Sequence, residues 1–194
     1  TTRNDIPPEG SSNWIDYYVW GGIVRDVNLI VTDPVHVDWT FVTTPSVSTG
    51  SASVNARTNI RNDSGASKSV TVTTSVVDAA NNVVATGSAT ATIAANSTRE
   101  FNYNTTTVSN PNLWHPDNPY LYTVYTQVQD GSTYVDEHKV RIGIRSIQFN
   151  ATDGKFYING QWLKLRGLDR HESYPYIGRA APNRLQAKDA DMLK

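Results

Sequence analysis

The sequence contains no cysteine and only one methionine. Without cysteine there are no disulfide bonds and no thiolate metal sites, which fits a bacterial cytoplasmic enzyme and an exported one equally well. Charged residues are scarce at 18%, and the net charge is −1. Such a chain offers no basic surface for phosphate groups, so we expect no nucleic acid partner.

Long hydrophobic runs are also missing. No stretch of about 18 apolar residues is present, so we expect no membrane partner. The first residues, Thr1 to Asp5, contain no initiator methionine and no signal-peptide pattern, and we expect them to be a cut or mature end. The chain is nevertheless aromatic enough to fold, with ten Tyr, five Trp and four Phe among 194 residues.

Alternating apolar and polar residues predict strands through the middle of the chain. In residues 35–42 the alternation predicts a half-buried strand with Trp39 and Phe41 facing inward. Asp130-Gly131 is a strong hairpin signal. Further strands are expected at 52–60, 70–76, 83–93, 100–105, 120–129 and 134–144. Short strands separated by turns predict an all-β fold, an immunoglobulin-like antiparallel β-sandwich over residues 35–146.

The two ends have other patterns. Residues 1–34 begin irregularly and are too short to bury a core of their own. Asn159-Gly160 predicts a hairpin between 156–158 and 162–166. Helical periodicity follows at 184–194, with Leu185, Met192 and Leu193 as its candidate apolar face. This change from strand to helix predicts the first unit of a different domain, such as a barrel.

Two segments contain candidate binding residues. Residues 16–27 combine aromatics, a glycine pair and charges, which suits a patch for sugar rings; alternatively the aromatics are core and Arg25 pairs with an acidic neighbour. Residues 166–172 are polar and follow a strand, where His171 could donate to a ligand hydroxyl, although an ordinary surface histidine fits the same pattern. The histidines lack metal-site spacing, and neither a serine-hydrolase elbow nor a phosphate loop is present.

Three stretches of the sequence, in this order, resemble glycoside hydrolase family 2. The first is Gly22-Ile23-Val24-Arg25-Asp26-Val27 with Thr32-Asp33-Pro34-Val35-His36-Val37; the second is Leu113-Trp114-His115-Pro116-Asp117-Asn118-Pro119-Tyr120-Leu121-Tyr122 with Ile142-Gly143-Ile144-Arg145; the third is Phe156-Tyr157-Ile158-Asn159-Gly160 with Leu165-Arg166-Gly167-Leu168-Asp169-Arg170-His171-Glu172. The resemblance implies the end of a sugar-binding jelly roll over 1–34, the sandwich over 35–146 and a truncated catalytic TIM barrel over 147–194. Asp169 departs from the family pattern, which commonly has Asn there.

The resemblance also implies a function for the parent protein. It implies a retaining β-glycosidase for a β-linked carbohydrate, by expectation a β-galactosidase, with Asp16 and His171 as substrate-binding residues. The family's catalytic glutamates come from later barrel strands, so we expect no catalytic residue, no metal site and no cofactor in this chain, and no activity from it alone. The parent's metal requirement and oligomeric state stay open.

The chain's own glutamates agree with this expectation. They are Glu9, Glu100, Glu137 and Glu172. Glu100 and Glu137 fall on predicted strands, and Glu172 is expected to be alone near the barrel segment. Two further hypotheses stay open: a free-standing immunoglobulin-like module for carbohydrate binding or adhesion, with Trp14, Trp20 and Trp39 as an aromatic platform, and a purely structural linker domain.

Overall fold

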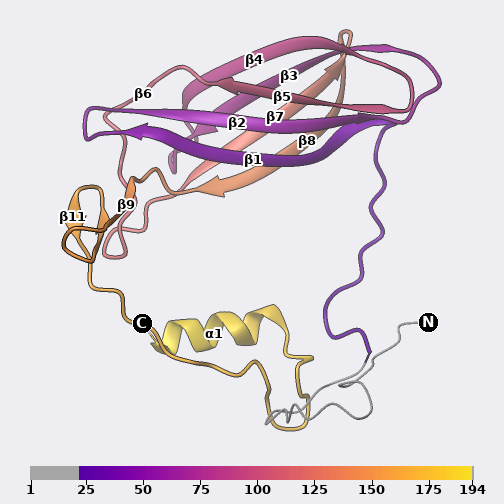
Figure 1. Cartoon of the computed structure of the whole chain (residues 1–194). Helices are drawn as coiled ribbons and strands as arrows, with labels where there is room; N and C mark the ends of the chain where they lie inside the picture. Colours follow the sequence, from indigo (N-terminus) through magenta and orange to yellow (C-terminus); the bar gives the residue numbers. More distant parts are fainter. Residues whose placement is uncertain (1–21, 194) are drawn as a thin grey trace. The chain divides into compact units, whose positions relative to one another are not determined.

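The computed structural model describes residues 22–193. These residues form two compact units, one over Val31–Leu165 and one that combines the residues up to Ile30 with those from Arg166 onward. The larger unit contains a β-sandwich and a small sheet, and the smaller unit contains a helix (Figure 1).

Two antiparallel sheets form the sandwich. One has the strand order β1-β2-β5 with the short β6 paired to β2, and the other has the order β4-β3-β7-β8. The strands are β1 (Val35–Val47), β2 (Ser51–Asn62), β3 (Lys68–Val77), β4 (Val83–Ile93), β5 (Ser97–Asn104), β6 (Val108–Ser109), β7 (Tyr122–Asp130) and β8 (Thr133–Ile142). Residues 35–146 contain no helix, which confirms the predicted all-β sandwich; β6 was not predicted.

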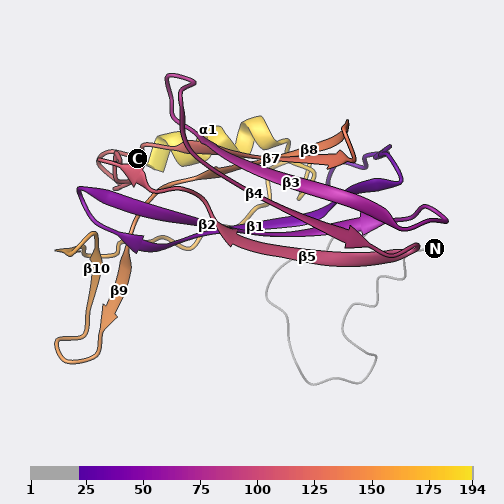
Figure 2. The ribbon, with the colours of Figure 1, turned by 90° about the horizontal axis from the view of Figure 1, so that it is seen from above.

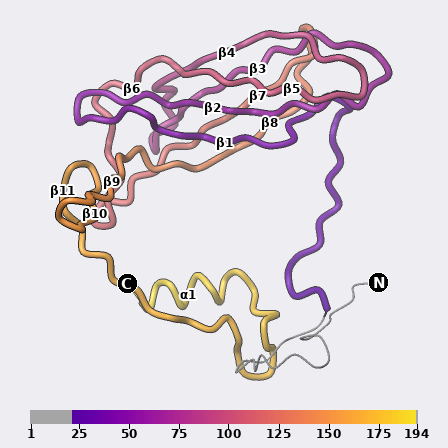
Figure 3. The backbone as a smooth tube through the Cα atoms, in the orientation of Figure 1, coloured from indigo at the N-terminus to yellow at the C-terminus, as the bar shows by residue number. Residues whose placement is uncertain are grey.

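The predicted turn between β7 and β8 is a two-residue hairpin loop. Figure 3 traces the path of the backbone. Asp130 pairs with Thr133, which leaves Gly131 and Ser132 as the loop. Gly131 has φ of 59°, a conformation that glycine adopts without a steric cost, as the first central position of a type II′ turn requires.

The core between the sheets consists of two apolar clusters. One contains Val54, Val76, Val124 and Ile144, and the other contains Ile60, Val72, Phe101 and Val128. On β2, β3 and β7 these residues alternate with exposed or half-buried ones, as expected for strands with one face turned inward. The apolar residues that recur at every second position of these strands therefore form the core.

A layer of threonines separates the two clusters. Thr58, Thr74 and Thr126 are fully buried, at 0% exposure, and each lies on its strand between members of the two clusters. The Thr74 hydroxyl is 2.9 Å from the hydroxyl of Tyr103, which also donates to the Val72 carbonyl at 3.1 Å. Among the described residues the Thr126 hydroxyl has no hydrogen-bond partner. Along the strands, the interior of the sandwich therefore passes from one apolar cluster through the layer of threonines to the other apolar cluster.

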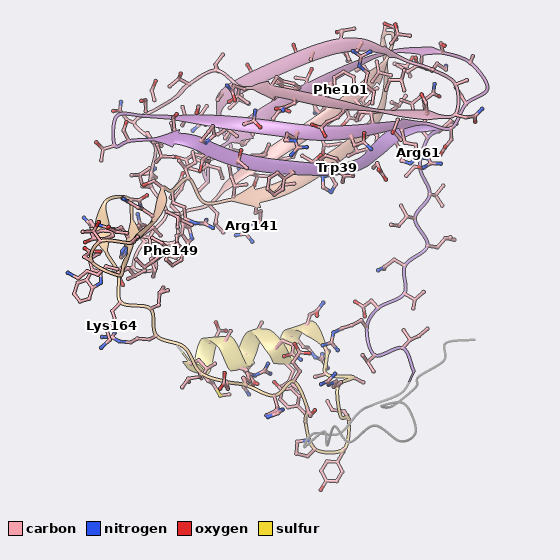
Figure 4. The ribbon with its side chains drawn as sticks, viewed as in Figure 1. Trp39, Arg61, Phe101, Arg141, Phe149 and Lys164 are labelled. Carbon is pink, nitrogen blue, oxygen red and sulfur yellow. The ribbon has the colours of Figure 1, made fainter. Side chains whose placement is uncertain are left out.

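The prediction that Trp39 and Phe41 face inward is wrong. The pairing of β1 with β2 shifts between Val37, opposite Ile60, and Trp39, opposite Asn59, so that Asp38 is an extra residue. Such a β-bulge exchanges the faces of the residues that follow it, here up to a second shift in the pairing between Thr43 and Ser46. Trp39, which is labelled in Figure 4, is 38% exposed, and Phe41 is 56% exposed, because after the bulge the alternate residues face the core.

The two sheets meet where β1 approaches β8. An irregularity of the other sheet, opposite Val128 and Gln129, lies in β8 next to Asp136. There the Asp136 carboxylate accepts a hydrogen bond of 2.8 Å from the backbone N–H of Val37 on β1. A side chain of one sheet thus satisfies a backbone group at the edge of the other.

The end of the sandwich is closed by the segment between β6 and β7. The Trp114 N–H donates to the Ile144 carbonyl at 2.9 Å, and the Arg145 guanidinium lies 4.8 Å from the centre of the Trp114 ring. The Tyr122 hydroxyl accepts from the Asn112 N–H at 2.9 Å, an arrangement similar to the tyrosine corner of immunoglobulin-like folds. Two of the motifs that resemble the family therefore contact each other.

A small antiparallel sheet follows the sandwich. It consists of β9 (Ile147–Asn150), β10 (Lys155–Ile158) and β11 (Gln161–Trp162), and Figure 2 shows β9 and β10 pointing away from the long strands. Asn159 and Gly160 form the predicted turn, both with positive φ, of 51° and 76°. The Asn159 side chain donates to the Trp114 carbonyl and accepts from the Ser146 N–H, at 2.9 and 3.0 Å, so this turn is fixed to the closed end of the sandwich.

The smaller unit contains α1 (Asn183–Leu193), which confirms the predicted helix. The helix has no buried residue, and two of the three predicted face residues, Met192 and Leu193, are exposed. Pro182 precedes its first residue, a favourable place for proline at a helix start.

Candidate functional site

The predicted sugar-binding residues lie in the smaller unit. His171 is exposed in the irregular segment that follows Arg166, and it has no hydrogen bond or ion pair within residues 22–193. Asp16 lies outside the described residues, as do Trp14 and Trp20. Their sugar-binding roles therefore stay predictions.

An ion pair joins the two segments that contain these candidates. Nη2 of Arg25 lies 2.9 Å from Oε2 of Glu172, and Nη1 of Arg25 donates to the Arg179 carbonyl at 2.5 Å. The expectation that Arg25 pairs with an acidic neighbour is confirmed, and that neighbour is Glu172. Both side chains are about half exposed, so the pair contributes at most about 1 kcal/mol, but it places Glu172, the residue after His171, beside the Gly22 to Val27 motif.

A cavity of about 320 Å³ lies beside Arg25. Residues 24–26 form one wall and residues 180–183, which lead into α1, form the other. Arg25, Asp26 and Asn183 supply donors and acceptors to this lining. A cavity of this size with both kinds of polar group suits a small polyhydroxylated ligand.

A hydrogen-bonded network holds the His171 segment against α1. Arg170 donates to Oδ2 of Asp189 through Nε at 2.8 Å, and the Tyr174 hydroxyl bonds to both residues. The bonds from Tyr174 and Arg170 keep the pKa of the Asp189 carboxyl below its usual range, and burial raises the pKa of Tyr174. Sequence reasoning missed this network because Asp189 lies 19 residues after Arg170 and no local motif joins them.

The described glutamates are bound to cations or donors. Glu100 accepts a bidentate pair from Arg57 at 3.0 and 2.9 Å, which lowers the pKa of the Glu100 carboxyl. Glu137 accepts from Gln127, which lowers the pKa of the Glu137 carboxyl. A general acid in glycoside hydrolysis needs a raised pKa, so both carboxyls are shifted in the opposite direction.

The described part of the chain contains no group of three or more His, Cys, Asp or Glu side chains that could hold a metal ion. It also contains no helix that is long and apolar enough to cross a membrane.

Two family profiles match the sequence. Residues 35–145 match the profile described as glycosyl hydrolases family 2, and residues 149–194 match the TIM barrel domain of the same family. The chain belongs to glycosyl hydrolase family 2. The Leu113 to Tyr122 and Ile142 to Arg145 motifs, which contact each other in the structure, lie inside the first match.

Curated relatives of the family cover nearly the whole chain. A β-galactosidase from Thermoanaerobacter pseudethanolicus is 36% identical over 99% of this chain and 25% of its own length. A β-galactosidase from Bacteroides ovatus is 34% identical over 99% of this chain and 22% of its own length. A β-glucuronidase from Formosa agariphila is 31% identical over 83% of this chain and 17% of its own length. The chain therefore spans about a quarter or less of these relatives.

Solved structures share the fold. A family 2 glycosyl hydrolase from Bacteroides cellulosilyticus has a TM-score of 0.77 and 32% identity over 84% of this chain and 22% of its own. A β-glucuronidase from Bacteroides uniformis also has a TM-score of 0.77, with 26% identity over 84% of this chain and 20% of its own. Both support the architecture described above.

Proposed function

We propose that the protein containing this chain is a retaining β-glycosidase that acts on β-linked hexosides, with galactosides as its preferred substrates. The observation that carries the proposal is the alignment of β-galactosidases along 99% of the chain at 36% and 34% identity. The β-glucuronidases align at 31% and 30% and cover 83% and 92% of the chain, which favours galactose over glucuronic acid.

In this reaction, the residues of this chain are proposed to bind the substrate and to support the catalytic barrel. Retaining hydrolysis needs two carboxyl groups about 5–5.5 Å apart, one of them with a raised pKa. The pKa shifts of Glu100 and Glu137 are in the other direction, and Glu172 is held by Arg25. The catalytic pair is therefore proposed to come from other barrel strands, and residues 35–146 to support that barrel.

Asp16 and His171 are proposed to contact the sugar. The ion pair of Arg25 with Glu172 supports this proposal, because it places the residue next to His171 beside a motif that begins six positions after Asp16. In this role the Asp16 carboxylate accepts hydrogen bonds from sugar hydroxyls, and an imidazole nitrogen of His171 donates to one.

The first experiment measures hydrolysis of nitrophenyl β-galactoside. The 194-residue chain is expected to show no turnover above background, because it lacks the two carboxylates. The whole protein is expected to hydrolyse the galactoside faster than the glucuronide. Turnover by the chain alone that is abolished by one Glu→Gln change within it would contradict the proposal.

The second experiment tests the two binding residues in the whole protein. Asp16→Ala and His171→Gln are each expected to lower kcat/KM by an amount equivalent to about 1–3 kcal/mol, the cost of losing a hydrogen bond to a buried sugar hydroxyl. His138→Gln is the matched control, since His138 is an exposed histidine on β8. Equal kcat/KM for the His171 and His138 variants would remove His171 from the site.

A further inference from the structure

The outer face of the β1-β2-β5 sheet presents an ordered grid of side chains. Strand register and the alternation of faces place nine residues on it in three rows, and none of them is buried. The rows are Trp39–Asn59–Glu100, Phe41–Arg57–Asn102 and Thr43–Asn55–Asn104. The face therefore has an aromatic margin along β1 and polar side chains across β2 and β5.

The aromatic margin is formed by two large rings in a row. Trp39 and Phe41 are 38% and 56% exposed and lie two positions apart on one strand, a separation of about 7 Å. The Arg57 guanidinium lies 5.9 Å from the centre of the Trp39 ring. A groove of about 560 Å³ opens beside Phe41 and extends to Trp114 and Leu121. Exposed aromatic rings beside polar groups mark surfaces that bind a partner.

The nine side chains of the grid carry no net charge, and the neighbouring Asp38 carboxylate, which accepts a bond of 3.1 Å from Asn59, adds one negative charge at the margin. The Arg57 charge is neutralised by the bidentate pair with Glu100, and the central and far columns otherwise consist of asparagines. Asn55 donates to both Asn102 and Asn104 at 3.0 Å. Within the described chain, the amide nitrogens of Asn102 and Asn104 have no acceptor, so two donors remain available to a ligand.

From these contacts we propose that this face binds a neutral glycan chain at a site separate from the one that holds Asp16 and His171. A hexose presents an apolar face of C–H groups that packs on an aromatic ring, and a rim of hydroxyls that bonds to amides. Two rings in line accept at least two successive sugars. The neutral grid complements an uncharged polymer and offers no attraction to a polyanion.

The proposal is tested by affinity electrophoresis of the 194-residue chain in gels that contain β-1,4-galactan. Retardation by the neutral galactan is expected, with none by the anionic polygalacturonate. Trp39→Ala is expected to weaken galactan binding about tenfold or more, as the loss of a central aromatic anchor does. Asn102→Ala, which removes one of the two available donors, should weaken it less.

Trp162→Ala is the matched control, since Trp162 is a similarly exposed tryptophan on β11, 59% exposed, outside this face. Circular dichroism confirms that each variant is folded. Absence of retardation, equal weakening by the Trp39 and Trp162 variants, or tighter retention by polygalacturonate would each overturn the proposal. So would burial of Trp39 in the whole protein, shown if acrylamide fails to quench the part of the fluorescence that a Trp39→Phe change removes. The gel measures no hydrolysis, so its result is independent of the proposed activity.

Discussion

Trp114 lies directly against Gly143, so that a Cβ atom at Gly143 would be 2.5 Å from Cγ of the indole ring. Real Cβ atoms essentially never approach another atom so closely; the Arg145 guanidinium also lies over the ring, and the Trp114 backbone is bonded to the Ile144 carbonyl. This contact joins two stretches that resemble the family in sequence. It gives a physical reason for a glycine between Ile142 and Ile144.

The first prediction follows from that contact. Gly143→Ala should lower the free energy of unfolding by about 1–3 kcal/mol, the usual cost of overpacking a core. Gly50→Ala is the matched control, because nothing lies within 4 Å of a Cβ there, and it should be neutral or slightly stabilising. Urea denaturation measures both, and equal stability of the two variants would mean that the Trp114 ring can move aside.

The second prediction concerns the threonine layer. Thr126→Val should raise the free energy of unfolding by about 1 kcal/mol, because it removes a buried hydroxyl that has no partner while it keeps the shape of the side chain. Thr74, directly opposite Thr126 on β3, provides the contrast. Thr74→Val should lower stability by about 0.5–1.5 kcal/mol, since its hydroxyl is bonded to Tyr103. Destabilisation by Thr126→Val in urea titrations would contradict the expectation.

The third prediction is a pH dependence that arises from Tyr103. Burial raises the pKa of its hydroxyl above the ordinary value of 10.0. The unfolded chain therefore ionises first as the pH rises, so the contribution of Tyr103 is complete below pH 10 and is lost as the pH rises through the folded pKa. Tyr103→Phe should lower stability at pH 8, and its deficit relative to the natural sequence should shrink above pH 10. A deficit that stays constant between pH 8 and pH 11 would exclude this linkage.

The fourth prediction separates the two roles of Asn159. Its side chain bonds to Trp114 and Ser146, and its backbone has φ of 51°. Asn159→Gly keeps access to that backbone conformation and removes the bonds, whereas Asn159→Ala loses both. Trypsin should therefore cleave after Lys164 or Arg166 faster in both variants, and fastest in Asn159→Ala, with the sandwich left intact. Cleavage rates that match the natural sequence would mean that the small sheet does not depend on these bonds.

The strands were predictable because one face of each is buried against the other sheet. Alternation located the strands that contain the buried Val54, Ile60, Val72 and Val124, and Gly131 marked the hairpin between β7 and β8. The orientation of Trp39 and Phe41 was not predictable, because the bulge at Asp38 becomes visible only when β1 is paired with β2. A single extra residue changes the face of the residues that follow it, until the next irregularity in the pairing.

The smaller unit was less predictable, for a different reason. The partner of Arg25 is Glu172, 147 positions away, and no local pattern specifies a contact at that separation. The network of Arg170, Tyr174 and Asp189 likewise depends on how α1 returns against the preceding segment. Residues 1–34 as a jelly-roll end and 147–194 as part of a barrel stay predictions, as do the roles of Asp16 and His171.

The bond from the Val37 N–H to Asp136 has a consequence for association between molecules. β1 is an edge strand, and its outward backbone groups could pair with a strand from another copy of the chain. At Val37 the donor is already used by a carboxylate of the other sheet, and the next residue is the bulge at Asp38. Within two residues, an incoming strand would meet the Val37 N–H, which is already hydrogen-bonded, a negatively charged carboxylate, and the change of strand register at Asp38. This corner of the sandwich therefore resists edge-to-edge aggregation through one side-chain bond and one bulge.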